Sequence, residues 1–174
     1  IDNMIIGIIA AAILVAIDQI TKYMALTKLK PVGNITFIEG FMDFTFVENR
    51  GAAFGIFQNK QIYFIVSAII IFIVAVWFYT KVPMNKRFLP IRICAVLICA
   101  GGIGNLIDRF FRPAGVVDFI DCYFFGIFGM ERWPTFNIAD SAVVICGAIF
   151  VVSFIVSLVK DLKKKKKKKE DVNE

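Results

Sequence analysis

Two aspartates stand in settings that would let them act together as an acid and a base. Asp118 lies in the apolar segment VVDFI, residues 116–120, and Asp140 lies just before the long apolar run of residues 142–159. Apolar surroundings raise the pKa of a carboxyl group, whereas negative charge is favoured in the first turn of a helix, where Asp140 is predicted to lie. Two such groups share one proton when they are close together. The pair suits general acid–base attack of water on an amide carbonyl, with no metal, no cofactor and no covalent intermediate.

Amide and guanidinium side chains elsewhere in the sequence could support this chemistry. Asn105, Arg109 and Asn137 are candidates to stabilise the developing oxyanion, since one such donor contributes about 3 kcal/mol in known enzymes. Asn137 is also predicted to cap the helix that follows it. Asn49 begins the segment NRGAAFG, residues 49–55, whose small residues allow close approach of another backbone. We interpret this segment as a substrate platform, with a plain turn as the alternative.

Each aspartate also has a simpler interpretation. Asp140 alone could be an acid that stabilises the start of its helix, and Asp118 alone could be a loop acid paired with Arg109 or Arg112. Asp121 is a third acid close to Asp118 and could take its place opposite Asp140. Spacing along the sequence does not show which carboxyl groups touch, so these alternatives stay open at the level of sequence.

The elements that must position these residues are long apolar helices. Of the 174 residues, 59% are hydrophobic, and the mean hydropathy is +0.75. Soluble domains are about 45–50% apolar, and here the excess is concentrated in blocks of about 20 residues, the length that a membrane-spanning helix requires. Four spans are predicted, at about residues 4–25, 62–79, 89–107 and 138–159. The fold class is therefore an α-helical integral membrane protein, with one membrane domain (residues 1–162) and a lysine-rich tail (residues 163–174).

Two segments between the spans differ in kind from the helices. Residues 35–38 and 41–47 are β-branched and aromatic with partial alternation, which predicts short strands at the membrane surface. Together with the turns around them they form a predicted small β-cradle over about residues 30–55. Residues 110–136 are interpreted as a mixed-charge, aromatic loop.

Basic residues indicate how the chain is oriented. The connector between the second and third spans contains Lys81, Lys86 and Arg87 and no acid, and the lysine run of residues 163–169 follows the fourth span. Basic connecting segments stay in the cytoplasm, so both termini are predicted to be cytoplasmic and the candidate polar residues to gather at the outer leaflet. The lysine run is interpreted as a contact with the lipid surface rather than with nucleic acid, because no aromatic residues are interleaved with it.

Ionisable residues inside the spans predict a polar interior. Asp18 and Lys22 are four residues apart and share a helix face. Charges within spanning segments are costly, which favours a pair that braces a polar site over one that is merely neutralised. Asn105, Asp108 and Arg109, at the end of the third span, are also spaced to face one way. The glycines that precede them, in residues 101–104, predict close packing of another helix.

Composition excludes several classes of chemistry. The sequence contains no histidine, which excludes the Ser-His and Cys-His nucleophile systems and the HExxH zinc site. Two other classes remain as alternatives: a transporter with a proton path through the acids, and a lipid-binding assembly subunit. The acids cluster at one surface and no internal repeat is found, whereas transporters place their sites at the midplane between repeats.

The chain closely resembles the lipoprotein signal peptidases (signal peptidase II), which are membrane aspartyl proteases of bacteria. Five stretches carry the resemblance, in the family's order: DQITK (18–22), NRGAAFG (49–55), GGIGNLIDR (101–109), VVDF (116–119) and FNIADS (136–141). Any one of them is weak, but five in order are highly specific, and with the spans they cover nearly the whole chain except the tail. Two features are not part of the family pattern: the lysine run, and the start at Ile1 rather than Met, from which we expect that some N-terminal residues are missing.

The resemblance implies a fold of four membrane helices with a small extracytoplasmic β-cradle. It implies an endopeptidase of the bacterial cytoplasmic membrane that removes the signal peptide from diacylglyceryl-modified prolipoproteins, cutting before the lipidated cysteine of the lipobox. Asp118 and Asp140 match the catalytic pair. The matching substrate-site residues are Asn49, Asn105, Arg109 and Asn137, and the supporting residues are Asp18, Lys22 and Asp108. Cyclic peptides of the globomycin type are implied as inhibitors, and the sequence gives no reason to expect an oligomer.

Overall fold

The computed structural model describes residues 2–51, 61–83 and 85–170, which form four long helices and a three-stranded sheet. The helices are α1 (Asp2–Met24), α2 (Gln61–Lys81), α3 (Leu89–Phe111) and α4 (Ile138–Glu170). Each contains a stretch long and apolar enough to cross a membrane, and few residues of these stretches in α1, α2 and α4 are buried within the protein. Apolar side chains that face outward are expected of helices in lipid. The predicted fold class, four spanning helices with a small sheet, is confirmed.

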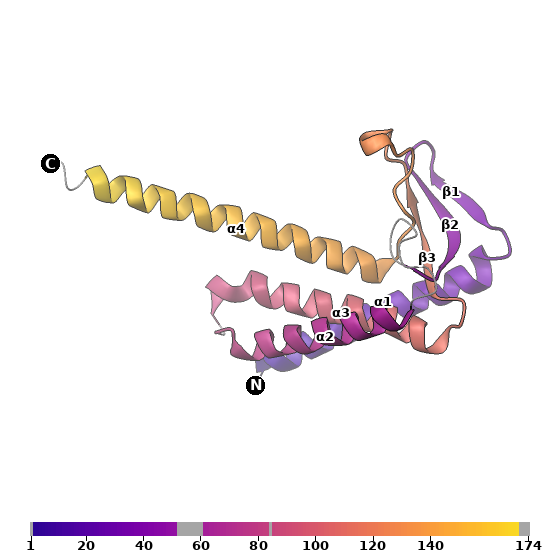
Figure 1. The fold of residues 1–174 in the computed structure, drawn as a ribbon, viewed down its shortest axis with the longest axis horizontal. Helices are drawn as coiled ribbons and strands as arrows, with labels where there is room; N and C mark the ends of the chain where they lie inside the picture. Colours follow the sequence, from indigo (N-terminus) through magenta and orange to yellow (C-terminus); the bar gives the residue numbers. More distant parts are fainter. Residues whose placement is uncertain (1, 52–60, 84, 171–174) are drawn as a thin grey trace.

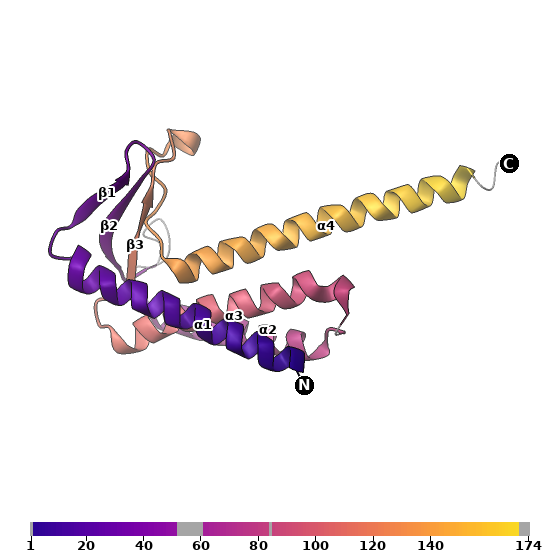
Figure 2. The ribbon, with the colours of Figure 1, turned by 180° about the vertical axis from the view of Figure 1, so that it is seen from behind.

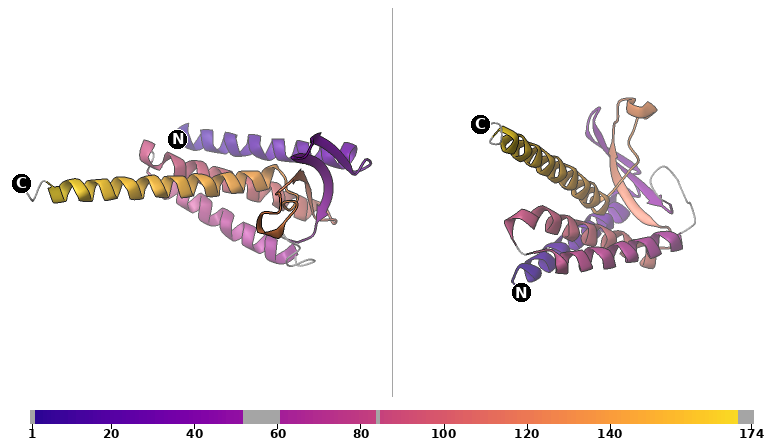
Figure 3. Two further views of the ribbon diagram at one scale, coloured as in Figure 1. Left: turned by 90° about the horizontal axis from the view of Figure 1, so that it is seen from above. Right: turned by 60° about the vertical axis from the view of Figure 1, so that its left-hand side comes forward.

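Helix α3 is the centre of the bundle and contacts each of the other three long helices. Seen from above, α1 and α2 lie on opposite sides of α3 and α4 lies over it (Figure 3). The sheet stands at one end of the bundle, far from both termini, and α4 projects beyond the other helices at the opposite end (Figures 1 and 2). The end of α1, the end of α3 and the start of α4 therefore meet beside the sheet.

Two glycines let the neighbouring helices approach the backbone of α3. A β-carbon added at Gly101 would lie 2.5 Å from the carbonyl oxygen of Ala139, and one added at Gly104 would lie 2.5 Å from a carboxylate oxygen of Asp18. A β-carbon added at Gly102, on another face of the same helix, would meet no neighbouring atom within 4 Å. Glycine at positions 101 and 104 thus allows α1 and the first turn of α4 to pack against α3.

We expect Gly101→Ala to destabilise the folded protein by about 1–3 kcal/mol, because the new methyl group would overpack against backbone that cannot rotate away. Gly102→Ala should be neutral or stabilising by up to about 1 kcal/mol, since alanine has the higher helix propensity. Unfolding free energies of both variants, measured in the same detergent, check this prediction. Equal stability of the two variants would contradict the close approach of α4 at Gly101.

The sheet is antiparallel, with the strand order β1 (Asn34–Ile38), β2 (Met42–Asn49) and β3 (Val116–Cys122). A five-residue π-helical turn, η1 (Ala25–Leu29), leads from α1 toward it. The buried side chains that join η1 to β3 are Ala25, Leu29, Val117 and Phe119. This small core packs β3 against the turn that follows α1. It therefore sets the position of the β3 residues relative to that helix.

Structure and sequence-based expectation differ in two elements. The segment 110–136, expected to be a loop, contains β3, whose side chains are buried on both faces, so that no apolar–polar alternation marks it as a strand. The predicted span of residues 138–159 matches the apolar stretch Ile138–Lys160, but helix α4 continues through the lysine run to Glu170, since lysine and glutamate favour helix. The two predicted strands are present as β1 and β2, and the part of the predicted cradle beyond residue 51 lies outside the described residues.

Candidate active site

Backbone pairing brings the start of α4 beside β3. Phe119 and Ile120 both donate their N–H groups to the carbonyl of Phe136, at 3.0 and 2.8 Å, and the N–H of Phe136 donates to the carbonyl of Ile120 at 3.0 Å. The next residue along the chain is Asn137, which this pairing places beside Asp118. The helix begins one residue later, so the candidate aspartates of β3 and α4 arrive at the same point.

Asn137 and Asp140 form a reciprocal cap at the start of α4. The N–H of Asp140 donates to Oδ1 of Asn137 at 2.9 Å, and the N–H of Asn137 donates to Oδ2 of Asp140 at 3.2 Å. This is the capping box, in which the N-cap side chain and the third helical residue satisfy each other's N–H groups. Asn137 therefore caps α4, as the sequence predicts, and the cap fixes the Asp140 carboxylate in one orientation.

Asp118 is only 2% exposed, and both of its carboxylate oxygens accept hydrogen bonds from amide side chains. Nδ2 of Asn137 donates to Oδ1 at 2.6 Å, and Nδ2 of Asn49 donates to Oδ2 at 2.9 Å. Burial, together with the neighbouring charge of Asp140, raises the pKa of Asp118 to about 7, and the two amides offset only part of this effect. Asp118 can therefore hold or release a proton near neutral pH.

Asn105 of α3 links Asp140 to the interior of the bundle. Its Nδ2 donates to Oδ1 of Asp140 at 2.8 Å, and its Oδ1 accepts from Nζ of Lys22 at 2.8 Å and from Nδ2 of Asn137 at 3.2 Å. Asn105 and Asn137 thus connect Lys22 to both Asp118 and Asp140. Each amide has its oxygen and its nitrogen engaged, so the network specifies the orientation of both side chains.

A buried lysine lies beneath the two aspartates. Lys22 is 0% exposed, and its Nζ contacts Oδ2 of Asp18 at 2.9 Å and Oδ2 of Asp108 at 3.1 Å, in addition to Asn105. Three acceptors match the three N–H donors of an ammonium group. Oδ1 of Asp18 accepts from the N–H of Ala139 at 2.9 Å, in the first turn of α4. The Asp18–Lys22 pair is therefore part of a network that braces the site.

Asp108 fastens β3 to the end of α3. Its Oδ2 accepts from the N–H of Val117 at 3.1 Å, and its Oδ1 accepts from Arg112 and from Gln19. Sequence reasoning did not single out Gln19, which also donates to Oδ2 of Asp18 at 3.1 Å. An amide in an otherwise apolar span, next to a buried acid, was the signal available for it.

Arg109 borders this network from the side of α2. Its guanidinium lies over the ring of Phe64, 5.1 Å from the centroid, and Nη1 donates to the carbonyl of Asn105 at 3.3 Å. Asn105, Asp108 and Arg109 do lie on one side of α3, but the last two occupy its edges, about 100° apart around the helix. Asp108 is therefore buried among the supporting residues. Arg109 lies close enough to Asp118 and Asp140 to interact with both electrostatically.

Asp121 lies on the opposite face of β3 from Asp118, because residues an odd number of positions apart in a strand point to opposite faces. Its Oδ2 accepts from Arg132 at 2.7 Å and from Thr45 at 2.9 Å. The structure therefore brings Asp118, and not Asp121, beside Asn137. Nor does Asp118 pair with Arg112, as the simpler interpretation allowed, since Arg112 pairs with Asp108.

Two carboxylates, three amides and a buried ammonium group thus converge where the helices meet the sheet. A carboxyl with a pKa of about 7 beside a second carboxylate is the arrangement of a general acid–base pair. The fold and the site together define a class: integral membrane proteins that hold a paired-carboxylate site at one end of a four-helix bundle.

Comparison with known proteins narrows this class to one family. Residues 10–156 match the family described as Signal peptidase (SPase) II, and the chain therefore belongs to that family of proteases. It is 44% identical to the lipoprotein signal peptidase of Borrelia turicatae over 158 residues. These aligned residues are 87% of this chain and 90% of that protein. The lipoprotein signal peptidase of Borrelia hermsii is 46% identical over 158 residues, or 86% of this chain and 90% of that protein. The resemblance drawn from the five motifs is confirmed.

A solved structure agrees with this assignment. A bacterial membrane enzyme determined at 2.3 Å resolution is 38% identical to this chain, with a TM-score of 0.74 over 91% of this chain and 90% of that one. A second bacterial membrane enzyme structure, at 1.9 Å resolution, has a TM-score of 0.71 over 89% of this chain and 93% of that one, also at 38% identity.

Proposed function

We propose that this protein is an aspartyl endopeptidase that removes the signal peptide from diacylglyceryl-modified prolipoproteins, cutting before the lipidated cysteine of the lipobox. The observation that carries the proposal is the contact of Asn137 with both carboxylates. Its side chain donates to Asp118, and its backbone N–H donates to Asp140. Membership of the signal peptidase II family, and relatives that are lipoprotein signal peptidases, support the substrate class.

In the proposed mechanism, Asp118 and Asp140 share one proton. The ionised carboxylate of Asp140 takes a proton from water while the water oxygen attacks the carbonyl carbon of the scissile bond. Asp118 is the protonated partner, because its pKa of about 7 lets it hold a proton at neutral pH. It gives this proton to the departing nitrogen as the C–N bond breaks, so that one proton remains on the pair and the products are an acid and an amine.

The neighbouring side chains have supporting roles in this proposal. The residues that contact the substrate are Asn49, Asn105, Arg109 and Asn137. Arg109, on the α2 side, supplies positive charge toward the developing oxyanion, the kind of interaction that contributes about 3 kcal/mol elsewhere. Lys22, with Asp18 and Asp108, keeps the two asparagines of the network in place. A cyclic peptide of the globomycin type would inhibit the enzyme by occupying the same site.

The orientation in the membrane follows from the distribution of basic residues. The connector that carries Lys81, Lys86 and Arg87 lies at the end of the bundle opposite the sheet (Figure 1). Basic connectors stay in the cytoplasm, so the sheet and the acid pair lie at the outer leaflet and both termini lie in the cytoplasm. The enzyme is proposed to act as a monomer.

We expect kcat/KM for the lipidated substrate to fall as the pH rises through about 7, because Asp118 then loses the shared proton. The same raised pKa affects stability. Between about pH 4 and about pH 7 the folded chain holds a proton that the unfolded chain releases, so stability declines as the pH rises through this window. Profiles of kcat/KM against pH for the wild-type enzyme check the first expectation, and a rate that keeps rising through pH 8 would contradict the role of Asp118 as the acid.

A cleavage assay with two substrates tests the proposed function. The substrates share one lipobox sequence, and only one carries diacylglycerol on its cysteine. Cleavage of the lipidated substrate alone, on the N-terminal side of the cysteine and identified by mass spectrometry, is expected. Cleavage of both at equal rates would contradict the lipid requirement. Binding without cleavage would instead indicate an assembly subunit, and proton flux into proteoliposomes that Asp140→Asn abolishes would indicate a transporter.

A further inference from the structure

Arg92 is a cation inside the membrane-spanning stretch of α3, a helix that begins at the end of the bundle opposite the sheet (Figure 1). It lies in the first turn of α3, within the apolar stretch Lys86–Phe111. Arg92 takes part in none of the ion pairs of the described residues, and its Nε atom is buried without a hydrogen-bond partner among them. Charged side chains in spanning segments normally pair with an opposite charge, and an unmet buried donor is costly. Arg92 is therefore a candidate to bind an anion.

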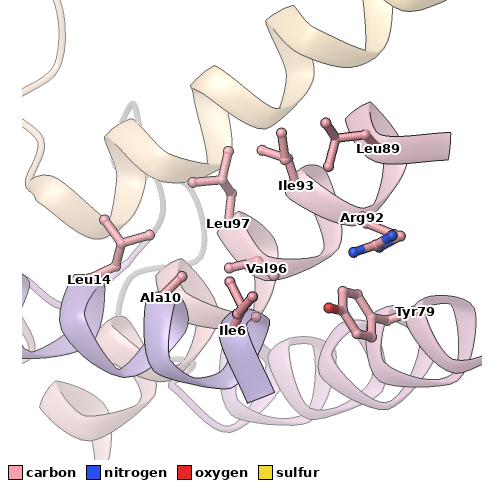
Figure 4. Close-up of a pocket in the computed structure, with 10 residues that line it drawn as sticks. Ile6, Ala10, Leu14, Tyr79, Leu89, Arg92, Ile93, Val96 and Leu97 are labelled. Carbon is pink, nitrogen blue, oxygen red and sulfur yellow. The ribbon is translucent and has the colours of Figure 1, made fainter. Parts of the chain in front are cut away.

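An apolar groove of about 320 Å³ starts at Arg92 and is lined by α1, α3 and the end of α2. Figure 4 shows Arg92 and Tyr79 beside each other at one end of the groove, with Ile6, Ala10 and Leu14 in succession along α1. These three residues are spaced by four, so they form one wall that extends about 12 Å along the helix. The groove joins a cation near the end of the bundle to an apolar channel directed toward its middle.

The position of Tyr79 is set by a close approach to α1. A β-carbon added at Gly7 would lie 2.5 Å from the hydroxyl oxygen of Tyr79, so glycine at this position makes room for the ring. The guanidinium of Arg92 lies 5.8 Å from the centroid of that ring. A cation over an aromatic face is attracted to it, and the ring therefore helps to hold Arg92 at the mouth of the groove.

Basic residues outnumber acids near this mouth, where Asp2 begins α1 about one turn before Ile6. The end of α2 contributes Lys81, the connector to α3 contributes Lys86 and Arg87, and the first turn of α3 contains no acid. The positive end of the α3 dipole lies at the same place. A ligand that matches both parts of the groove carries negative charge at one end and an apolar chain at the other.

We propose that this groove binds an anionic phospholipid, whose phosphate pairs with the guanidinium of Arg92 and one of whose acyl chains lies along α1. A guanidinium can donate two parallel hydrogen bonds to phosphate oxygens, and basic pockets between spanning helices suit anionic headgroups. The groove is lined by residues 89–97 of α3, whereas Asn105, which contacts Asp140, lies toward the other end of that helix, so the lipid site is separate from the proposed active site.

Native mass spectrometry of the full-length protein tests this inference. The protein is titrated in detergent with dioleoyl phosphatidylglycerol and, in parallel, with dioleoyl phosphatidylcholine. The wild-type protein should retain one phosphatidylglycerol molecule about tenfold more tightly than phosphatidylcholine, and Arg92→Gln should lose about that factor, because charge-assisted hydrogen bonds are lost. Arg92→Lys, which keeps the charge without the planar fork, should bind with intermediate affinity and shows that any loss is not a failure to fold.

Two further variants separate the headgroup, the chain and general charge. Lys160→Gln removes one positive charge on α4, which does not line the groove, and should bind as the wild type does. Ala10→Phe fills the apolar part while Arg92 stays, and should also weaken binding. Equal binding by the wild type and Arg92→Gln, or equal losses in Lys160→Gln and Arg92→Gln, would overturn the proposal. A dimer that Ala10→Phe dissociates, with no lipid retained by the wild type, would assign the groove to a second copy and would also overturn it.

Discussion

Asp118→Asn and Asp140→Asn should each lower kcat for a diacylglyceryl-lipobox substrate by about 10³-fold or more. A general acid or base contributes about 10²–10⁴-fold, and asparagine can neither accept the proton from water nor donate one to the leaving nitrogen. The fold should survive, because asparagine keeps the size of the side chain and can still bond to Asn49 or Asn105, which now contact the carboxylates. Steady-state cleavage rates, measured beside thermal unfolding of the same preparations, check both expectations.

Asp121→Asn is the matched control for these two variants. It makes the same chemical change three residues from Asp118, on the face of β3 that contacts Arg132. Its cleavage rate should stay within a few-fold of the wild type. The variant with both Asp118→Asn and Asp140→Asn should be no slower than either single variant, since the two groups act as one unit. Normal turnover in either single variant would refute the proposed catalytic pair.

Lys22→Met should destabilise the folded protein by about 3–5 kcal/mol, the largest stability effect that we expect of a single substitution. Methionine fills the space of the lysine stem but leaves the buried carboxylate of Asp18 without a cation and that of Asp108 with Arg112 alone. Removing one partner of a buried ion pair costs this much because the remaining charge is uncompensated. Unfolding of wild type and variant by denaturant in one detergent gives the difference directly.

Lys30→Met provides the comparison for Lys22→Met. Lys30 pairs with Glu48 at the surface, where the two side chains are 50% and 30% exposed. Exposed ion pairs contribute at most about 1 kcal/mol, so this variant should be nearly as stable as the wild type. If the two lysine variants lost the same stability, the buried network would not hold the site together as described.

Local patterns in the sequence were sufficient to predict the helices and part of the site. A run of about 20 apolar residues predicts a spanning helix without knowledge of its neighbours, and all four are present. The spacing of Asp18 and Lys22 predicts their contact because residues i and i+4 share a helix face. Asn137 could likewise be predicted as a cap, since the capping interaction involves residues only three apart.

The remaining features depend on contacts between distant parts of the chain. Strand β3 is buried on both faces and has no periodic pattern, so its pairing with β2 and with Phe136 was not apparent from the sequence. The contact between Asn137 and Asp118 follows from that pairing. Spacing along the sequence could not distinguish Asp118 from Asp121 for the same reason, because the choice depends on which face of β3 meets α4; only the family resemblance favoured Asp118.

The proposed catalytic pair requires the proton that Asp118 and Asp140 share, and titration of aspartate carboxyl carbons by ¹³C NMR in detergent observes this proton directly. In the wild-type protein Asp118 should titrate at about pH 7, and in Asp140→Asn its midpoint should be lower, because the repulsion from the second carboxylate is gone. A wild-type midpoint at the ordinary value of about 4, or one near 7 that Asp140→Asn leaves unchanged, would contradict the shared proton.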